Sequence, residues 1–210
     1  CPSTCGRSSS EKSTMKNLSA IAVYCGSSDG NDPSHLRCAH DFGELLAREG
    51  IALVYGGGNV GLMGAVADGA LRGGGEVHGV ITRALEVKEL AHRGLTSLIT
   101  VETMHERKAA MADRADAFVA LPGGFGTYDE LFEVITWTQL GIQEKPCGIL
   151  NNGGFFDELI AFIDKATRAG FVKPPHRDAV VCENDGESML TRLRAWVPAA
   201  IPKIVDRGER

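Results

Sequence analysis

Short apolar runs alternate with longer, partly polar segments from residue 18 onward. These runs are rich in β-branched residues and are apolar almost throughout, so they predict strands of a parallel sheet that is covered on both faces. Seven runs have this character: Ala20–Cys25, Ile51–Tyr55, Val77–Ile81, Ser97–Val101, Ala117–Leu121, Cys147–Asn151 and Ala179–Cys182.

The segments between these runs predict helices. Asp32 and Pro33 predict the start of the first helix, because Asp caps helix N-termini and Pro fits the first helical position, and Gly50 predicts its end. The other predicted helices cover residues 62–73, 104–115, 127–140, 156–169 and 186–196. Strands interleaved with helices predict an α/β fold, a single-domain, Rossmann-like, doubly wound parallel sheet of about seven strands with helices on both faces.

The two ends of the chain lie outside this pattern. Residues 1–17 are Ser-rich and unpatterned, which predicts a disordered or added extension, with Met15 as a plausible natural start. A chain that begins at Cys also fits a processed lipoprotein, so both interpretations stay open. We expect one folded domain over residues 18–197 and a C-terminal tail over residues 198–210.

Three loops at the predicted carboxyl edge of the sheet are candidates for ligand binding. Residues 25–29, 56–61 and 121–127 each follow a predicted strand and precede a helix. Ligands of open α/β sheets bind outside the carboxyl ends of the strands. The convergence of the three loops therefore predicts a ligand site at this edge.

Composition narrows the kind of ligand. Glycine makes up 26 of 210 residues, and its excess lies in the second and third loops and in residues 73–75, where it predicts a helix end. A net charge of −5 without a basic block argues against binding of nucleic acid, and no apolar run is long enough to span a membrane.

The six cysteines are scattered along the sequence, which predicts reduced thiols in a cytoplasmic protein.

Gly56, Gly58 and Gly61 have the spacing of the dinucleotide-binding fingerprint, whose glycines let a phosphate approach backbone N–H groups. That fingerprint also needs an acidic residue at the end of the next strand to hold the ribose, and residues 80–83 offer none. NAD binding is therefore disfavoured. A phosphate-binding turn and a purely structural turn both stay open.

The segment Pro122-Gly-Gly-Phe-Gly-Thr-Tyr-Asp-Glu130 is more specific. Successive glycines free N–H groups to point at an anion, Thr127 adds a hydroxyl, and a helix N-terminus favours negative charge. The alternative is local, because Thr127 and Glu130 have the spacing of a capping box. Thr103 and Glu106 share that spacing, and there we expect only the capping box.

Arg107 and Lys108 fall near the N-terminus of the helix that Thr103 begins. Cations there oppose the helix dipole, so an anionic group is expected to offset them. Such a pair often forms a solvated face, but its position on the ligand side of the sheet favours a role in binding. The histidines lack metal-site spacing, and we expect neither a metal nor another cofactor.

In the segments 122–130 and 107–108 the chain resembles the Lonely Guy family of cytokinin riboside 5′-monophosphate phosphoribohydrolases, which are often mislabelled lysine decarboxylases. The family motif PGGxGTxxE is complete at residues 122–130, and its Arg-Lys pair is complete at residues 107–108. The similarity covers roughly residues 18–197. A pyridoxal decarboxylase needs a Schiff-base Lys and a partner for the pyridine nitrogen, and we can place neither.

The resemblance implies hydrolysis of the N-glycosidic bond of an N6-modified AMP to free base and ribose 5-phosphate, by a homodimer or larger homo-oligomer with sites near subunit interfaces. It implies that Arg107 and Glu130 form the catalytic pair. Implied substrate contacts are Glu89, Lys108, Gly124, Phe125, Gly126, Thr127, Tyr128, Asp129, Glu130 and Thr136, and Ser28 and Gly58 are expected to help hold the 5′-phosphate.

Two other functions stay open. The first is a general AMP or purine nucleotide 5′-monophosphate nucleosidase whose base pocket has no room for an N6 side chain. The second is a non-enzymatic carrier of a phosphorylated, molybdopterin-type cofactor. The presence of both Arg107 and Glu130 favours hydrolysis, because a carboxylate stabilises the oxocarbenium-like state of glycosidic cleavage.

Overall fold

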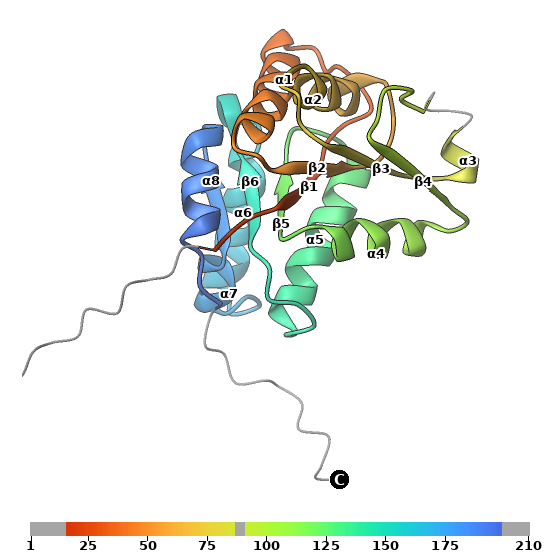
Figure 1. The fold of residues 1–210 in the computed structure, drawn as a ribbon. Coiled ribbons are helices and arrows are strands. Elements are labelled where there is room, and N and C mark those ends of the chain that lie inside the picture. Colours follow the sequence, from red (N-terminus) through yellow and green to blue (C-terminus); the bar gives the residue numbers. More distant parts are fainter. Residues whose placement is uncertain (1–15, 87–90, 199–210) are drawn as a thin grey trace, which may run out of the picture.

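A seven-stranded, all-parallel sheet forms the centre of the molecule (Figure 1). The structure is a computed structural model that describes residues 16–86 and 91–198. In sheet order the strands are β4 (Ser97–Val101), β3 (Val77–Thr82), β2 (Ala52–Tyr55), β1 (Ala20–Tyr24), β5 (Ala117–Ala120), β6 (Cys147–Leu150) and β7 (Val180–Glu183). Each predicted strand is confirmed, with its ends shifted by one residue at most.

Helices cover both faces of this sheet, as the sequence predicts. One face carries α1 (Pro33–Arg48), α2 (Gly61–Arg72) and α8 (Gly186–Arg194), and the other carries α4 (Met104–Arg114), α5 (Phe125–Gln139) and α6 (Asp157–Arg168). Figure 1 shows α1 and α2 across the sheet from α4 and α5. Because the chain winds from β1 to one edge and then from β5 to the other, the single domain is doubly wound.

Alternate residues of the central strand enter different cores. Ile21 and Val23 of β1 pack with side chains of α1, α2 and α8, whereas Ala22 and Tyr24 pack with side chains of α4 and α5. All four are buried. This arrangement explains why the run is apolar at every position, since a strand covered on both faces has no solvent side.

Three short elements were not predicted from the sequence. They are α3 (Arg83–Glu86), a 3₁₀ turn η1 (Asn152–Gly154) and α7 (Pro174–Asp178). Each has five residues or fewer. So short a segment does not complete the two turns of apolar spacing that identify a helix.

Two helix glycines bring α1 and α2 into close contact. A Cβ atom on Gly43 of α1 would overlap with the carbonyl oxygen of Val66, and one on Gly69 of α2 would overlap with that of His40. The close packing fixes α2 and the loop before it against the sheet. Gly73 is the C-cap of α2, which confirms the helix end predicted at residues 73–75.

The predicted extension and tail fall almost wholly outside the described residues, which begin at residue 16 and end at residue 198. Within the described residues, no helix combines the length and apolar character needed to cross a bilayer. The four described cysteines are free thiols, of which Cys25 and Cys147 are buried.

Candidate active site

A cavity of about 480 Å³ opens at the carboxyl edge of the sheet, where the winding direction reverses between β1 and β5. The loop after β1, the first turn of α2, the loop after β5 and the first turn of α5 line it, together with Arg107 of α4. Ligand sites of doubly wound sheets lie at such switch points. The first and third predicted loops thus meet as expected, and the second contributes Gly56.

The N-terminus of α5 faces this cavity. The helix begins at Phe125 with Gly124 as its N-cap, and the N–H of Tyr128 donates to the Gly124 carbonyl at 3.1 Å. A Cβ atom on Gly124 or Gly126 would meet no atom of the described residues within 4 Å. Gly124 and the first-turn residues Phe125, Gly126 and Thr127 line the cavity, and first-turn N–H groups have no partner inside a helix, so this end of α5 is suited to an anion.

The capping-box interpretation of Thr127 and Glu130 is wrong. Because α5 begins two residues before Thr127, this threonine lies inside the first turn and is buried at 3% exposure. A Cβ atom on Gly123 would overlap with the Thr127 hydroxyl oxygen, so this glycine makes room for the threonine. By contrast, Thr103 and Glu106 form the complete capping box that was predicted, and this box begins α4.

Glycines also hold the loops of β1 and β5 together. The N–H of Gly26 donates to the carbonyl of Pro122 at 3.0 Å, and the carbonyl of Gly26 accepts from the N–H of Met63 at 3.2 Å. A Cβ atom on Gly26 would lie 3.2 Å from the Cα of Gly123. The three walls of the cavity are therefore joined through backbone groups.

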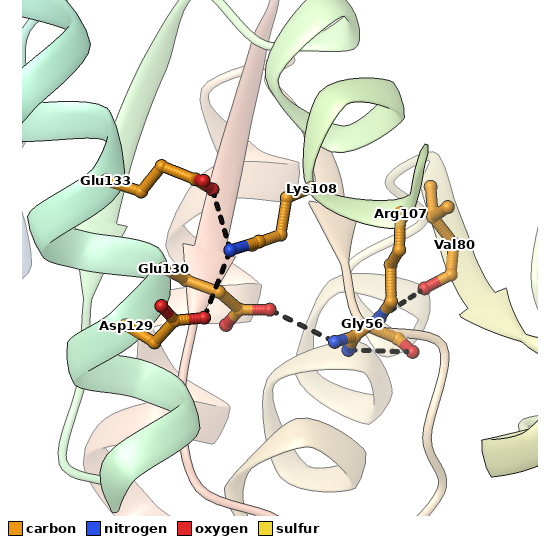
Figure 2. Close-up of polar contacts among 7 residues, drawn as sticks. All are labelled: Gly56, Val80, Arg107, Lys108, Asp129, Glu130 and Glu133. Atoms are coloured by element: carbon orange, nitrogen blue, oxygen red, sulfur yellow. Dashed lines mark hydrogen bonds and ion pairs between the residues drawn. The ribbon is translucent and has the colours of Figure 1, made fainter. Parts of the chain in front are cut away.

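Arg107 and Glu130 form a buried ion pair at the cavity (Figure 2). Nη1 of Arg107 donates to Oε1 of Glu130 at 3.1 Å, and the two residues are 6% and 8% exposed. Nε donates to the carbonyl of Val80 at 3.0 Å, and Nη2 donates to the carbonyl of Gly56 at 3.4 Å. The solvated-face interpretation is therefore wrong for Arg107, whose guanidinium is fixed on three sides.

Lys108 lies next to this pair but bonds elsewhere. Its Nζ lies 3.1 Å from Oδ2 of Asp129 and 3.1 Å from Oε2 of Glu133, both on α5. Desolvation lowers the pKa of Lys108, but the carboxylates of Glu133 and Asp129 outweigh it, so the pKa lies above its usual value. Asp129 is among the described residues that line the cavity, whereas Lys108 is not.

The remaining predicted contacts are spread over three places. Ser28, Gly124, Phe125, Gly126, Thr127 and Asp129 line the cavity. Tyr128 and Thr136 line a separate, open groove of about 460 Å³ along α5. Gly58 pairs with Ala91 in an isolated antiparallel bridge and is not among the described cavity residues. Glu89 lies outside the described residues.

Several residues that line the cavity were not predicted from the sequence. Met63, Met104, Phe155 and His35 add an apolar and aromatic lining, and the rings of His35 and Phe155 meet edge-on with centroids 5.4 Å apart. Met63 could have been found, because it lies in the first turn of the helix that follows the candidate loop 56–61. Met104 could have been found because it begins the helix that carries Arg107. No motif marks Phe155, which follows the 3₁₀ turn η1.

Two titratable side chains near the Arg107–Glu130 pair, Cys25 and Tyr24, are held in their neutral forms. Burial, and then the charge of Glu130, raise the pKa of the Cys25 thiol far above its usual value, so it is not a nucleophile. The same two causes, in the same order, raise the pKa of Tyr24.

Among the described residues, His40, Asp41 and Glu44 of α1 could offer three metal ligands, but none of them lines the cavity.

The fold and the site together define a Rossmann-like α/β protein with a cavity and a buried Arg–Glu pair at its switch point. Residues 63–193 match the protein family described as "Possible lysine decarboxylase". The chain is 46% identical to cytokinin riboside 5′-monophosphate phosphoribohydrolase LOG2 of Arabidopsis thaliana, over 88% of this chain and 87% of that protein. It is 47% identical to "Probable cytokinin riboside 5′-monophosphate phosphoribohydrolase LOGL5" of Oryza sativa subsp. japonica, over 88% and 75%.

This chain belongs to the cytokinin riboside 5′-monophosphate phosphoribohydrolase family, as the resemblance of its motifs predicted. Solved structures with the same fold include the molybdenum cofactor carrier protein of Chlamydomonas reinhardtii, with a TM-score of 0.64 and 22% identity over 83% of this chain and 95% of that one. The molybdenum cofactor binding protein of Rippkaea orientalis has a TM-score of 0.63 and 22% identity, over 83% and 94%. At this identity the likeness concerns the fold.

Proposed function

We propose that this protein is an N-glycosyl hydrolase that cleaves cytokinin riboside 5′-monophosphates, which are N6-modified AMP, into free base and ribose 5-phosphate. The observation that carries the proposal is the buried Arg107–Glu130 pair, which lies at the same cavity as the open N-terminus of α5. Relatives that are 46% and 47% identical carry this activity in their names.

The 5′-phosphate binds at the N-terminus of α5. Gly124 and Gly126 leave free space there, and the hydroxyl of Thr127 and the loop of Ser28 border the same cavity. Several N–H donors and the helix dipole act together on one anion. Binding energy from this group, remote from the bond that breaks, positions the ribose for reaction.

Glu130 acts on the ribose. Water adds to C1′ while the bond from C1′ to the base breaks, and the transition state carries positive charge on the sugar. A carboxylate beside the sugar stabilises that charge, and it can hold the ribose hydroxyls or accept the proton of the attacking water. The Arg107 guanidinium at 3.1 Å orients the carboxylate toward this task.

Arg107 does not serve as an ordinary proton donor, because the pKa of a guanidinium stays above about 12. Three of its five N–H groups bond to Val80, Gly56 and Glu130. The guanidinium also orients the ribose or the phosphate and stabilises charge on the departing base. The apolar side chains of Met63, Met104 and Phe155 line the same cavity and suit a purine with an apolar N6 group.

Base release measured by HPLC tests the activity. The substrates are isopentenyl-AMP, AMP and unphosphorylated isopentenyladenosine, each at the same concentration. We expect the fastest release from isopentenyl-AMP and a large loss with the riboside, because the riboside cannot use the α5 N-terminus. Faster release from AMP would instead favour the general nucleosidase, and equal rates with and without phosphate would contradict phosphate binding at this site.

The fold shared with molybdenum cofactor carriers supports a second candidate function, the carriage of a phosphorylated cofactor. A carrier needs the α5 N-terminus but has no use for a catalytic carboxylate. Tight binding of a molybdopterin-type ligand without turnover of any nucleotide would favour the carrier. Turnover that depends on Glu130 would exclude it as the main function.

We infer a homodimer or larger homo-oligomer. Phe132 is 38% exposed in the open groove that Tyr128, Thr136 and Trp137 also line. Thr136 lies about 14 Å along α5 from Thr127, at a rise of 1.5 Å per residue, so the substrate contact that the resemblance implies for it favours an assembly through α5. Light scattering after gel filtration tests this, and Phe132→Glu should yield monomers. A fully active wild-type monomer would contradict the inference.

We also infer a cytoplasmic location. The free thiols of Cys25 and Cys147, buried in the core, suit a reducing compartment.

A further inference from the structure

We propose that Gly56 is a positioning residue for catalysis, because its missing side chain creates the space in which the Arg107 guanidinium meets Glu130. The proposal rests on the hydrolytic function proposed above and adds a residue to it. Gly56 follows β2 and was predicted only as part of a phosphate-binding or structural turn.

The space beside Gly56 is filled by the guanidinium. A Cβ atom at this position would overlap with Nη2 of Arg107 and would lie 3.3 Å from Cζ. It would also lie 3.0 Å from Sδ of Met63, which is a flexible side chain. The Gly56 carbonyl accepts a hydrogen bond from the same Nη2 at 3.4 Å, as Figure 2 shows.

Conformation does not require glycine here. The positive-φ glycines of this loop are Gly57 (φ 80°) and Gly61 (φ 63°), and Gly56 does not share that conformation. An alanine at position 56 is therefore compatible with the backbone, and its methyl group meets the catalytic guanidinium directly. This separates Gly56 from the neighbouring glycines, whose substitution would strain the turn itself.

The guanidinium has little freedom to move aside. Nε is held by the Val80 carbonyl at 3.0 Å, and the side chain of Arg107 is 8% exposed. A methyl group on residue 56 would push the planar group out of this position, and the bond from Nη1 to Glu130 would lengthen or break. Displacements of about 1 Å at a catalytic group can cost about a hundredfold in rate.

A double-mutant cycle tests the proposal with Gly56→Ala, Arg107→Lys and the double variant. Lys keeps a positive charge near Glu130 but lacks the Nη2 atom that the alanine methyl group meets. We expect Gly56→Ala to lower kcat for base release from isopentenyl-AMP by about a hundredfold and to lower the Tm. In the Arg107→Lys background the same change should have little effect on either quantity.

Gly148→Ala is the matched control. It adds a methyl group in β6, where Cβ would lie 2.5 Å from Sδ of Met189, away from the described cavity residues. We expect a lower Tm with kcat unchanged, and equal effects in both Arg107 backgrounds. Loss of activity in Gly56→Ala that this control does not show then reports on position and not on general stability.

Several outcomes decide the matter. Normal turnover in Gly56→Ala, or effects of Gly56→Ala on kcat and Tm that are equal in both backgrounds, would overturn the proposal. If Gly56→Ala fails to fold, folding of the double variant supports it and failure of the double variant overturns it. If the wild type releases no base, the proposed function fails, and the Tm cycle still decides whether residue 56 acts through Arg107.

Discussion

Arg107 and Lys108 are neighbours on α4, and both reach across to carboxylates of α5, but their surroundings differ. The Arg107–Glu130 pair is buried, faces the cavity and is anchored by two backbone carbonyls. The Lys108 bridge joins Asp129, whose side chain is 63% exposed, and Glu133, 23% exposed. The first pair places charge at the cavity, whereas the second joins α4 to α5 through a partly exposed bridge.

This comparison predicts unequal consequences for the two cations. A buried charge that loses its partner pays the full cost of desolvation, whereas a bridge with an exposed partner is screened by water.

Replacement of Arg107 should have the largest effect. Arg107→Met leaves the Glu130 carboxylate and the carbonyls of Gly56 and Val80 without their guanidinium, so the free energy of unfolding should fall by about 3–5 kcal/mol. Base release should fall by about a hundredfold or more. Urea unfolding and HPLC turnover measure the two losses. A variant with unchanged stability and turnover would contradict a role of the buried pair in both stability and catalysis.

Replacement of Lys108 should have a smaller effect. Lys108→Met keeps the apolar stem and removes both ion pairs, so we expect a loss of about 1 kcal/mol in unfolding free energy and modest changes in kcat. Urea unfolding and steady-state kinetics check this. The substrate contact that the resemblance implies for Lys108 remains a prediction, and an increase of KM by about tenfold or more would support it.

The pH dependence of the Lys108 bridge should be the smallest effect. The pKa of Lys108 is higher in the folded protein than its usual 10.5, so the bridge stabilises the fold fully below about pH 10.5. Its contribution is lost as the pH rises through the folded-state pKa. The difference in unfolding free energy between wild type and Lys108→Met should thus be constant near neutral pH and shrink in alkali. A difference that grows with pH would contradict the assignment.

The sequence predicted the sheet well because buried parallel strands have a simple pattern. A run such as residues 20–25 is apolar at every position for one physical reason, which is burial on both faces. The loops at the strand ends then identified the cavity wall, because the position of ligands in such sheets follows from topology. The family motifs at residues 107–108 and 122–130 named the pair that the fold brings within 3.1 Å.

The start of α5 and the contacts of Arg107 could not be predicted from the sequence. Thr103 and Thr127 have identical capping-box spacing, but only Thr103 caps its helix, since Gly124 begins α5 earlier and Thr127 is buried against Gly123. The anchors of Arg107 are carbonyls, and every residue has a carbonyl, so no residue type marks them. The space beside Gly56 exists only once β2 and α4 are packed together.

Turnover and ligand binding in Glu130→Gln test most directly whether the buried Arg107–Glu130 pair performs the chemistry. The amide keeps the shape of the side chain and can still accept from Arg107, but it cannot stabilise positive charge or act as a base. We expect AMP to bind with nearly unchanged affinity while kcat for isopentenyl-AMP falls by about a hundredfold or more. Turnover close to that of the wild type would contradict the claim that the buried Arg107–Glu130 pair performs the chemistry.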